Sequence, residues 1–229
     1  MPSLKDIRKR VSSVRNTQQI TKAMKAVAAA KLRRAHDAAV EARPYAEKMR
    51  ELLRNLSARV SEKSHPLLID REEKRIDVLL VTADRGLCGA YNSNVIRLAE
   101  NFRADQQEKQ ITFRFVGRKG SEYFRRREVV AMDNSPVTWH SSVDDLASAA
   151  AGQLVGRFLN GDSDAAYIIY SQFRSALSQV PAAARVVPVA PSEVDEEQHL
   201  TEYLLEPSIS DLLSNLLPKS VEAQVYQAM

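Results

Sequence analysis

The sequence predicts an α/β fold in which a long N-terminal helix precedes a parallel sheet with helices on both of its faces. Three observations lead to this fold class. A 3,4 spacing of apolar and small residues runs through residues 3–60, strand-like and helix-like segments alternate within 76–207, and a helical period returns from Ser208 to Met229.

Residues 3–60 are predicted to form one helix that belongs to a coiled coil. Ser3 followed by Asp6 resembles a capping box, and the chain has no glycine before Gly86. Such a helix would be about 80 Å long at about 1.5 Å per residue. The seam positions are Leu4, Ile7, Val11, Val14, Gln18, Thr21, Lys25, Ala28, Leu32, Ala35, Ala39, Ala42, Ala46, Met49, Leu53, Leu56 and Val60.

The apolar stripe of this helix drifts in its middle, where Ile20, Met24 and Val27 lie off the seam. Pro44 removes one backbone donor and is expected to kink the helix near 40–43. A lone helix cannot bury such a stripe, so a partner helix is expected. The alternative interpretation is a charged helix surrounded by water.

A polar linker is predicted at 61–75, followed by an α/β domain at 76–207. Near-continuous apolar strands that alternate with helices favour a parallel sheet covered on both faces. Strands are expected near 76–83, 111–116, 128–132, 165–171 and 184–189, and helices near 91–107, 118–126 and 143–160.

The segment 208–229 reads as the start of a second long helix, bent at Pro218. It ends at Met229 without a glycine or another capping signal, so we expect a truncation there. Its apolar positions on a helical period are Ile209, Leu212, Leu213, Leu216, Leu217, Val221 and Val225.

The charge of the chain is distributed unevenly. Residues 1–35 hold ten basic residues and one acidic residue, a net +9, whereas the whole chain carries +4, so 36–229 carry −5. A basic arm on an acidic body predicts an acidic or polyanionic partner, either nucleic acid or an acidic protein surface. Residues 1–44 contain no aromatic side chain for stacking on bases, which disfavours nucleic acid.

Composition excludes several other classes. The hydrophobic content of 44% and charged content of 27% are those of a globular protein, and the longest apolar runs are too short to span a bilayer. Met1–Asp6 is not a secretory signal. The single cysteine, Cys88, permits no internal disulfide and is expected to be a small buried side chain.

Two glycine-containing turns have some of the features of nucleotide sites. The turn 84–92 follows a strand and opens a helix, but its two glycines lie three apart and no acidic residue ends the second strand to hold a ribose. The turn 117–121 lacks the spacing of a phosphate loop. We therefore interpret both as structural turns, with a dinucleotide-dependent enzyme as the weaker alternative.

No catalytic, cofactor-binding or metal-binding residue is predicted. His36, His65, His140 and His199 are scattered, and no pair has the spacing of zinc ligands. No Gly-x-Ser-x-Gly elbow accompanies a histidine. The pattern therefore predicts a protein that acts through its surfaces.

Several segments of the chain form specific motifs: Ser-Leu-Lys-Asp-Ile-Arg at 3–8, Asn-Thr-Gln-Gln-Ile-Thr-Lys-Ala-Met-Lys at 16–25, Val-Ala-Ala-Ala-Lys-Leu-Arg-Arg at 27–34 and Thr-Ala-Asp-Arg-Gly-Leu-Cys-Gly at 82–89. These segments closely resemble the gamma subunits of F-type ATP synthases. Ser-Gln-Val-Pro at 178–181 and Val-Glu-Ala-Gln-Val-Tyr-Gln at 221–227 are also similar. The similar segments occur in order along the whole chain.

The resemblance implies a central rotor shaft without catalytic activity. Its N- and C-terminal helices would form an antiparallel coiled coil inside a ring of three alpha and three beta subunits. A Rossmann-like domain would sit at the foot, on the epsilon subunit and the membrane c-ring. Proton flow would turn the shaft, and its asymmetry would drive the beta sites through their states.

The resemblance also implies contact residues. Met24 and Lys25 match the stretch that faces an acidic loop of beta, and the basic cluster near the N-terminus matches the end inside the upper bearing. The foot toward epsilon and the c-ring would include Tyr203, Glu206 and Pro207. The basic cluster consists of Lys5, Arg8, Lys9 and Arg10.

Some features depart from the family pattern. The family's returning C-terminal helix is missing after Met229, Ala26 replaces a common methionine, and the two-cysteine insertion of chloroplast subunits is absent. A bacterial-type subunit on the cytoplasmic face of the inner membrane is therefore expected, with no cofactor, no bound nucleic acid and no transmembrane segment.

Overall fold

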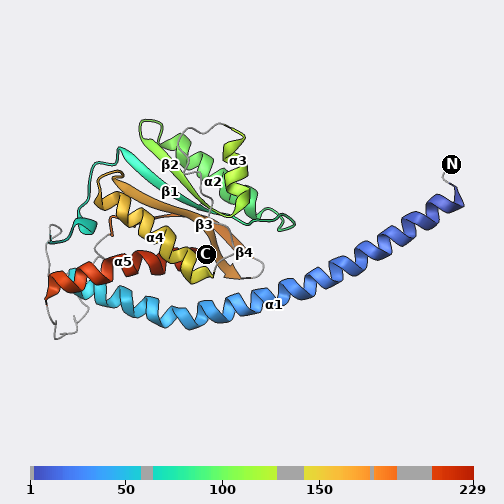
Figure 1. Ribbon diagram of the computed structural model, residues 1–229, viewed down its shortest axis with the longest axis horizontal. Helices are drawn as coiled ribbons and strands as arrows, with labels where there is room; N and C mark the ends of the chain where they lie inside the picture. The colour runs from blue at the N-terminus through green and yellow to red at the C-terminus, as the bar shows by residue number, and fades with distance from the viewer. Residues whose placement is uncertain (1–2, 58–63, 128–141, 176–177, 190–207) are drawn as a thin grey trace. The chain divides into compact units, whose positions relative to one another are not determined.

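A computed structural model of the chain describes residues 3–57, 64–127, 142–175, 178–189 and 208–229. It divides into two compact units, Met1–Tyr45 and Ala46–Met229, and the first helix belongs to both. The elements are α1 (Leu4–Ser57), η2 (Pro66–Leu68), β1 (Arg75–Val81), α2 (Tyr91–Asp105), β2 (Gln110–Val116), α3 (Arg118–Arg125), α4 (Val143–Leu159), β3 (Ala165–Ser175), β4 (Ser178–Val187) and α5 (Ile209–Ala228) (Figure 1).

α1 is the predicted long helix, and its start has the predicted cap. The Ser3 hydroxyl donates to Asp6 Oδ2 at 2.8 Å, and the backbone N–H of Ser3 donates to the same oxygen at 3.1 Å. The amide of Asp6 donates in turn to Ser3 Oγ at 3.3 Å. α1 continues through Pro44, so the helix does not end there; the kink near 40–43 remains a prediction.

The sheet of the second unit has the strand order β2-β1-β3-β4. β1 pairs in parallel with both β2 and β3, which confirms the central part of the predicted sheet. β4, however, is antiparallel to β3, so the prediction of a wholly parallel sheet was wrong. Only two residues separate Ser175 from Ser178, whereas a parallel crossover needs about a dozen.

Helices cover the sheet on both sides, because the side chains of β1 alternate between two hydrophobic cores. Ile76, Val78 and Leu80 pack with α2 and α3, and the rings of Phe113 and Phe124 stack there with centroids 4.7 Å apart. Leu79 and Val81 face the other core, which is formed with α4, α5 and the end of α1. Both cores belong to the second unit.

The remaining elements agree closely with the predicted helices. α2, α3 and α4 end within two residues of the predicted positions, and α5 begins after Ser208, whose hydroxyl accepts from the amide of Asp211 at 3.1 Å. The strand expected at 128–132 lies outside the described residues, as do residues 190–207 at the end of the predicted α/β domain. The boundaries at 60 and 75 remain predictions.

Candidate functional site

The exposed part of α1 carries the predicted contact residues. Lys5, Arg8, Lys9, Arg10, Met24 and Lys25 all lie on α1 and are exposed. They are brought together only by sharing one helix, because the basic cluster and Met24 are separated by about four helical turns. The predicted foot residues Tyr203, Glu206 and Pro207 lie outside the described residues.

Every large apolar side chain between Leu4 and Tyr45 is exposed. The values run from 46% for Val40 to 76% for Leu4, and Met24 is 47% exposed. Burying one such side chain completely stabilises a protein by about 1.5–3 kcal/mol, so this stripe represents a large unused binding energy. The full set is Leu4, Ile7, Val11, Val14, Ile20, Met24, Val27, Leu32, Val40 and Tyr45.

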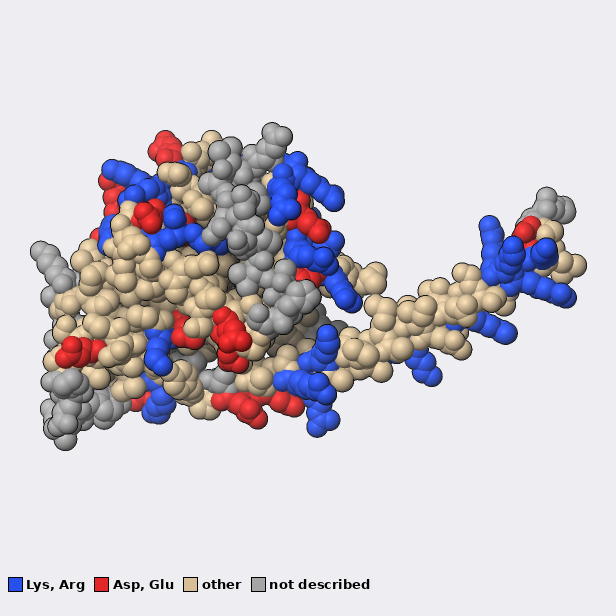
Figure 2. Space-filling view, in the orientation of Figure 1, with Lys and Arg blue, Asp and Glu red and all other residues tan. Residues whose placement is uncertain are grey.

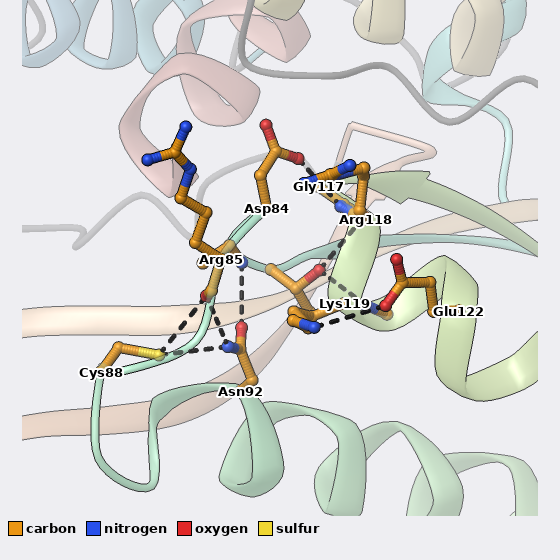
Figure 3. Close-up of polar contacts among 11 residues, drawn as sticks. Asp84, Arg85, Cys88, Asn92, Gly117, Arg118, Lys119 and Glu122 are labelled. Carbon is orange, nitrogen blue, oxygen red and sulfur yellow. Dashed lines mark hydrogen bonds and ion pairs between the residues drawn. The ribbon is translucent and has the colours of Figure 1, made fainter.

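The turn after β1 is held rigidly by one asparagine. The Asn92 amide oxygen accepts from the backbone N–H of Ala83 at 2.9 Å, and its nitrogen donates to Cys88 Sγ at 3.1 Å and to the carbonyl of Arg85 at 3.4 Å (Figure 3). Asn92 thus connects both ends of the turn. The predicted strand-to-helix turn is confirmed.

The tip of this turn projects apolar and thiol groups into solvent. Leu87 has a φ of 64°, which is strained for a bulky residue, and is 92% exposed. The predicted burial of Cys88 was wrong, because its side chain faces Asn92 and the carbonyl of Arg85 at the surface instead of the core. Nothing in the sequence pattern distinguished these two orientations.

The start of α3 has no open position for a phosphate. Its first amides donate to groups of the same chain: Arg118 N–H to Asp84 Oδ1 at 2.9 Å, and Lys119 N–H to the carbonyl of Ala83 at 3.1 Å (Figure 3). Gly120 N–H donates to Thr82 Oγ1 at 2.9 Å. A phosphate needs such amides free, and the Asp84 carboxylate would repel it. The geometry favours a structural turn.

Glycine is required at 117 to bring the two turns together. A Cβ at this position would lie 1.9 Å from the carbonyl oxygen of Thr82, and Gly117 has a φ of 87°. This close approach lets the β2–α3 connection dock on the end of β1. The glycine therefore serves packing between neighbouring strands.

A half-buried charge network joins the four strands at the end of the sheet opposite to these turns. Glu73 precedes β1 and accepts from Lys109 Nζ at 3.0 Å and from the Tyr167 hydroxyl at 2.8 Å. Arg185 on β4 lies 3.6 Å from the same carboxylate. Burial and the bond to Glu73 raise the pKa of Tyr167 to about 12. Despite the opposing effect of burial, Lys109, Tyr167 and Arg185 lower the pKa of Glu73.

Within the described ranges, no group of three or more histidine, cysteine, aspartate or glutamate side chains could hold a metal ion. The same residues contain no helix that is both long enough and apolar enough to cross a membrane.

The fold and its surfaces together define a class of protein: an α/β subunit that presents a long exposed helix to partners.

Comparison with known proteins narrows this class. The family model described as ATP synthase matches residues 3–229. The ATP synthase gamma chain of Solibacter usitatus is 45% identical over 235 residues, and that of Pelotomaculum thermopropionicum is 40% identical over 229 residues. Both alignments cover 100% of this chain and 80% of the relative. The chain belongs to the ATP synthase gamma chain family.

Solved structures share the fold. The central stalk and c-ring structure of the Tetrahymena thermophila mitochondrial ATP synthase contains a chain with a TM-score of 0.67 at 23% identity; 91% of this chain and 90% of that chain are covered. A rotor chain of the Euglena gracilis mitochondrial ATP synthase has a TM-score of 0.63 at 18% identity, with coverage of 96% and 82%. The predicted α/β fold with a long N-terminal helix is thereby confirmed.

Proposed function

We propose that this chain is the non-catalytic rotor shaft of a proton-translocating ATP synthase. It transmits torque between the membrane c-ring and the catalytic sites of an alpha–beta hexamer. The observation that carries the proposal is the exposed stripe of α1, where side chains from Leu4 to Tyr45 remain 46–76% exposed. Kinship with gamma chains at 40–45% identity over the full chain supports the same role.

The shaft works through contacts that can be made and broken as it turns. Exposed cations such as Lys5 and Lys25 form weak, screened pairs with acidic loops, typically worth about 0–1 kcal/mol each. Weak pairs do not lock a bearing. We assign Lys5, Arg8, Lys9 and Arg10 to the upper bearing of the ring, and Met24 and Lys25 to a beta loop.

The foot of the shaft binds the epsilon subunit and the c-ring in this proposal. Tyr203, Glu206 and Pro207 are the residues assigned to it. The apolar seam of α1 packs on an antiparallel helix in the assembled complex, which satisfies the stripe that the chain leaves exposed. Proposed domain boundaries are 1–60, 61–75, 76–207 and 208–229.

ATP is not bound or hydrolysed by this chain in the proposed role. The amides of Arg118, Lys119 and Gly120 are already hydrogen-bonded within the chain, which supports that assignment. The chain acts as a peripheral subunit on the cytoplasmic face of a bacterial inner membrane.

Reconstitution tests the proposal directly. The chain is mixed with alpha and beta subunits from the same organism, and the purified ring is assayed for ATP hydrolysis and for rotation of a bead attached at the foot. We expect stoichiometric incorporation and ATP-driven rotation. Failure to join the ring, or hydrolysis of ATP by the isolated chain, would refute the proposed role.

A further inference from the structure

The second unit carries a basic surface of its own. Residues 91–127 hold nine basic and four acidic residues, a net +5, although 36–229 as a whole carry −5. Lys109 and Arg114 are engaged elsewhere, with Glu73 and Gln153. Figure 2 shows Lys and Arg gathering on the side of this unit where Figure 1 places α3.

Five arginines form what we term the arginine face. Glu100 on α2 connects this helix to the end of α3, because its Oε1 accepts from the Tyr123 hydroxyl at 2.7 Å and lies 3.8 Å from Arg127 Nε. Arg97 and Arg103 each lie three residues from Glu100 and so share its side of α2. The other three arginines lie at the end of α3. The arginine face consists of Arg97, Arg103, Arg125, Arg126 and Arg127, all of which are exposed.

Two of these guanidinium groups are already held in position. Arg127 lies over the Tyr123 ring, 3.8 Å from its centroid, and Arg125 donates to Ser121 Oγ at 3.4 Å. The Arg97, Arg103 and Arg126 side chains form no hydrogen bond or ion pair with the described residues. A partly preorganised cluster loses less conformational entropy when it binds a partner.

The four acids of this segment, Glu100, Asp105, Glu108 and Glu122, do not cancel the field of this surface, because the net charge of 91–127 is +5 with all four counted. Glu100 is occupied by Tyr123 and Arg127, and Glu122 lies 3.4 Å from Lys119. Guanidinium groups suit carboxylates, because their paired N–H groups match the two oxygens. The excess of arginine over lysine therefore favours bidentate recognition of anions.

Other features of the same surface indicate the chemistry of the partner. The Tyr123 ring is covered by Arg127, so it offers no platform for stacking a nucleic acid base. No large apolar residue of 91–127 is exposed, so the surface has nothing to insert into a lipid bilayer. We infer that the arginine face docks an acidic segment of another protein; this proposal does not depend on the rotor role.

A local reporter can test this inference in the full chain. Cys88→Ser combined with Ala104→Cys places one thiol beside Arg103, and bimane on this thiol reports binding at the arginine face. The probe is a peptide of ten glutamates. The quantity measured is the midpoint, the peptide concentration that gives half of the full bimane response. We expect Arg125→Glu, Arg126→Glu and Arg127→Glu together to raise this midpoint about tenfold or more.

Matched variants control for net charge and for folding. Arg8→Glu, Lys9→Glu and Arg10→Glu make the same charge change on α1 and should leave the bimane midpoint within about twofold. Arg126→Glu alone, at a side chain without partners among the described residues, should weaken binding about threefold without loss of folding. Replacing all three arginines 125–127 by lysine should also weaken binding about threefold.

Several results would overturn the inference. One is an equal loss in the α1 variant, which would mean that the bimane follows net charge alone. Another is an unchanged midpoint in the lysine variant. A third is tighter binding of phosphatidylglycerol vesicles or of a thymidine 20-mer than of the glutamate peptide, which would assign the surface to lipid or nucleic acid.

Discussion

The two ends of α1 use the same kinds of apolar residue in opposite surroundings. Val14 is 67% exposed, whereas Met49 and Leu56, farther along the same helix, are 6% and 3% exposed. The end of α1 packs into the core formed with α4 and α5. The difference teaches that an apolar repeat predicts burial without revealing whether the burying partner belongs to the same chain.

The largest expected contrast between the two regions is in hydrogen exchange of the isolated chain. The described side chains of 4–45 are exposed, and helix propensity alone gives the backbone amides of this segment little protection. We expect them to exchange about 10⁴-fold faster than those of β1. Mass spectrometry after pulsed labelling measures this ratio. Equal protection in a monomer would contradict the proposed exposure of α1.

A substitution in the core of the second unit should change the free energy of unfolding much more than one on the exposed part of α1. Phe158→Ala removes a fully buried ring that also lies under Arg71, with a guanidinium-to-centroid distance of 4.1 Å. We expect a loss of about 3–5 kcal/mol in the free energy of unfolding, measured with urea. Val14→Ala should change it by less than about 0.5 kcal/mol. If both substitutions lowered the free energy of unfolding by a similar amount, the contrast between the buried core and the exposed part of α1 would be refuted.

Gly117→Ala tests the close approach of the two turns within the second unit. The new Cβ would lie 1.9 Å from Thr82 O, and alanine disfavours a φ of 87°. We expect destabilisation by about 2–4 kcal/mol in thermal and urea unfolding. Gly152→Ala on α4 is the matched control: its Cβ meets nothing within 4 Å, so a small stabilisation is expected.

Glu73→Gln tests the charge network that joins the strands. The folded-state pKa of Glu73 lies below its ordinary value, so its contribution is present above the unfolded pKa and is lost as pH falls through the folded pKa. We expect a loss of about 2 kcal/mol at pH 7 that shrinks below pH 4.5. Glu72→Gln, at an 80% exposed side chain, should show neither effect.

The smallest effect on the isolated chain is expected at Met24. Met24→Lys adds a cation to an exposed position and should leave the free energy of unfolding within about 0.5 kcal/mol. In the assembled complex the same change should lower the coupling between hydrolysis and proton pumping. Ala23→Lys is the matched control, because it adds the same charge about 100° around the helix from Met24. Normal assembly with unchanged coupling would refute the assignment of Met24.

Much of the fold follows from local patterns in the sequence. The Ser3–Asp6 cap, the strand at β1 and the starts of α2 and α3 are set by residues close in sequence, and these predictions are confirmed. The direction of β4 was missed because the predicted strands stopped at 171 and resumed at 184. The longer β3 and β4 leave room only for a tight connection.

The candidate site could be predicted only in part. The position of the turn after β1 followed from its glycines and its place after an apolar strand. Asp84 capping α3 and the Tyr123 hydroxyl donating to Glu100 were not predictable, because these contacts depend on how α2 and α3 lie on the sheet. Side-chain partners across elements need the tertiary arrangement, which no periodicity supplies.

The exposed position of Cys88 has a practical consequence. It is the single cysteine of the 229-residue sequence, and its turn is fixed by Asn92 at both ends. A maleimide dye or gold particle would attach at one known point on a rigid support. The Cys88 thiol of the native chain can therefore serve as a labelling site for single-molecule experiments. The fluorescence polarisation of a dye attached there would report the orientation of the sheet.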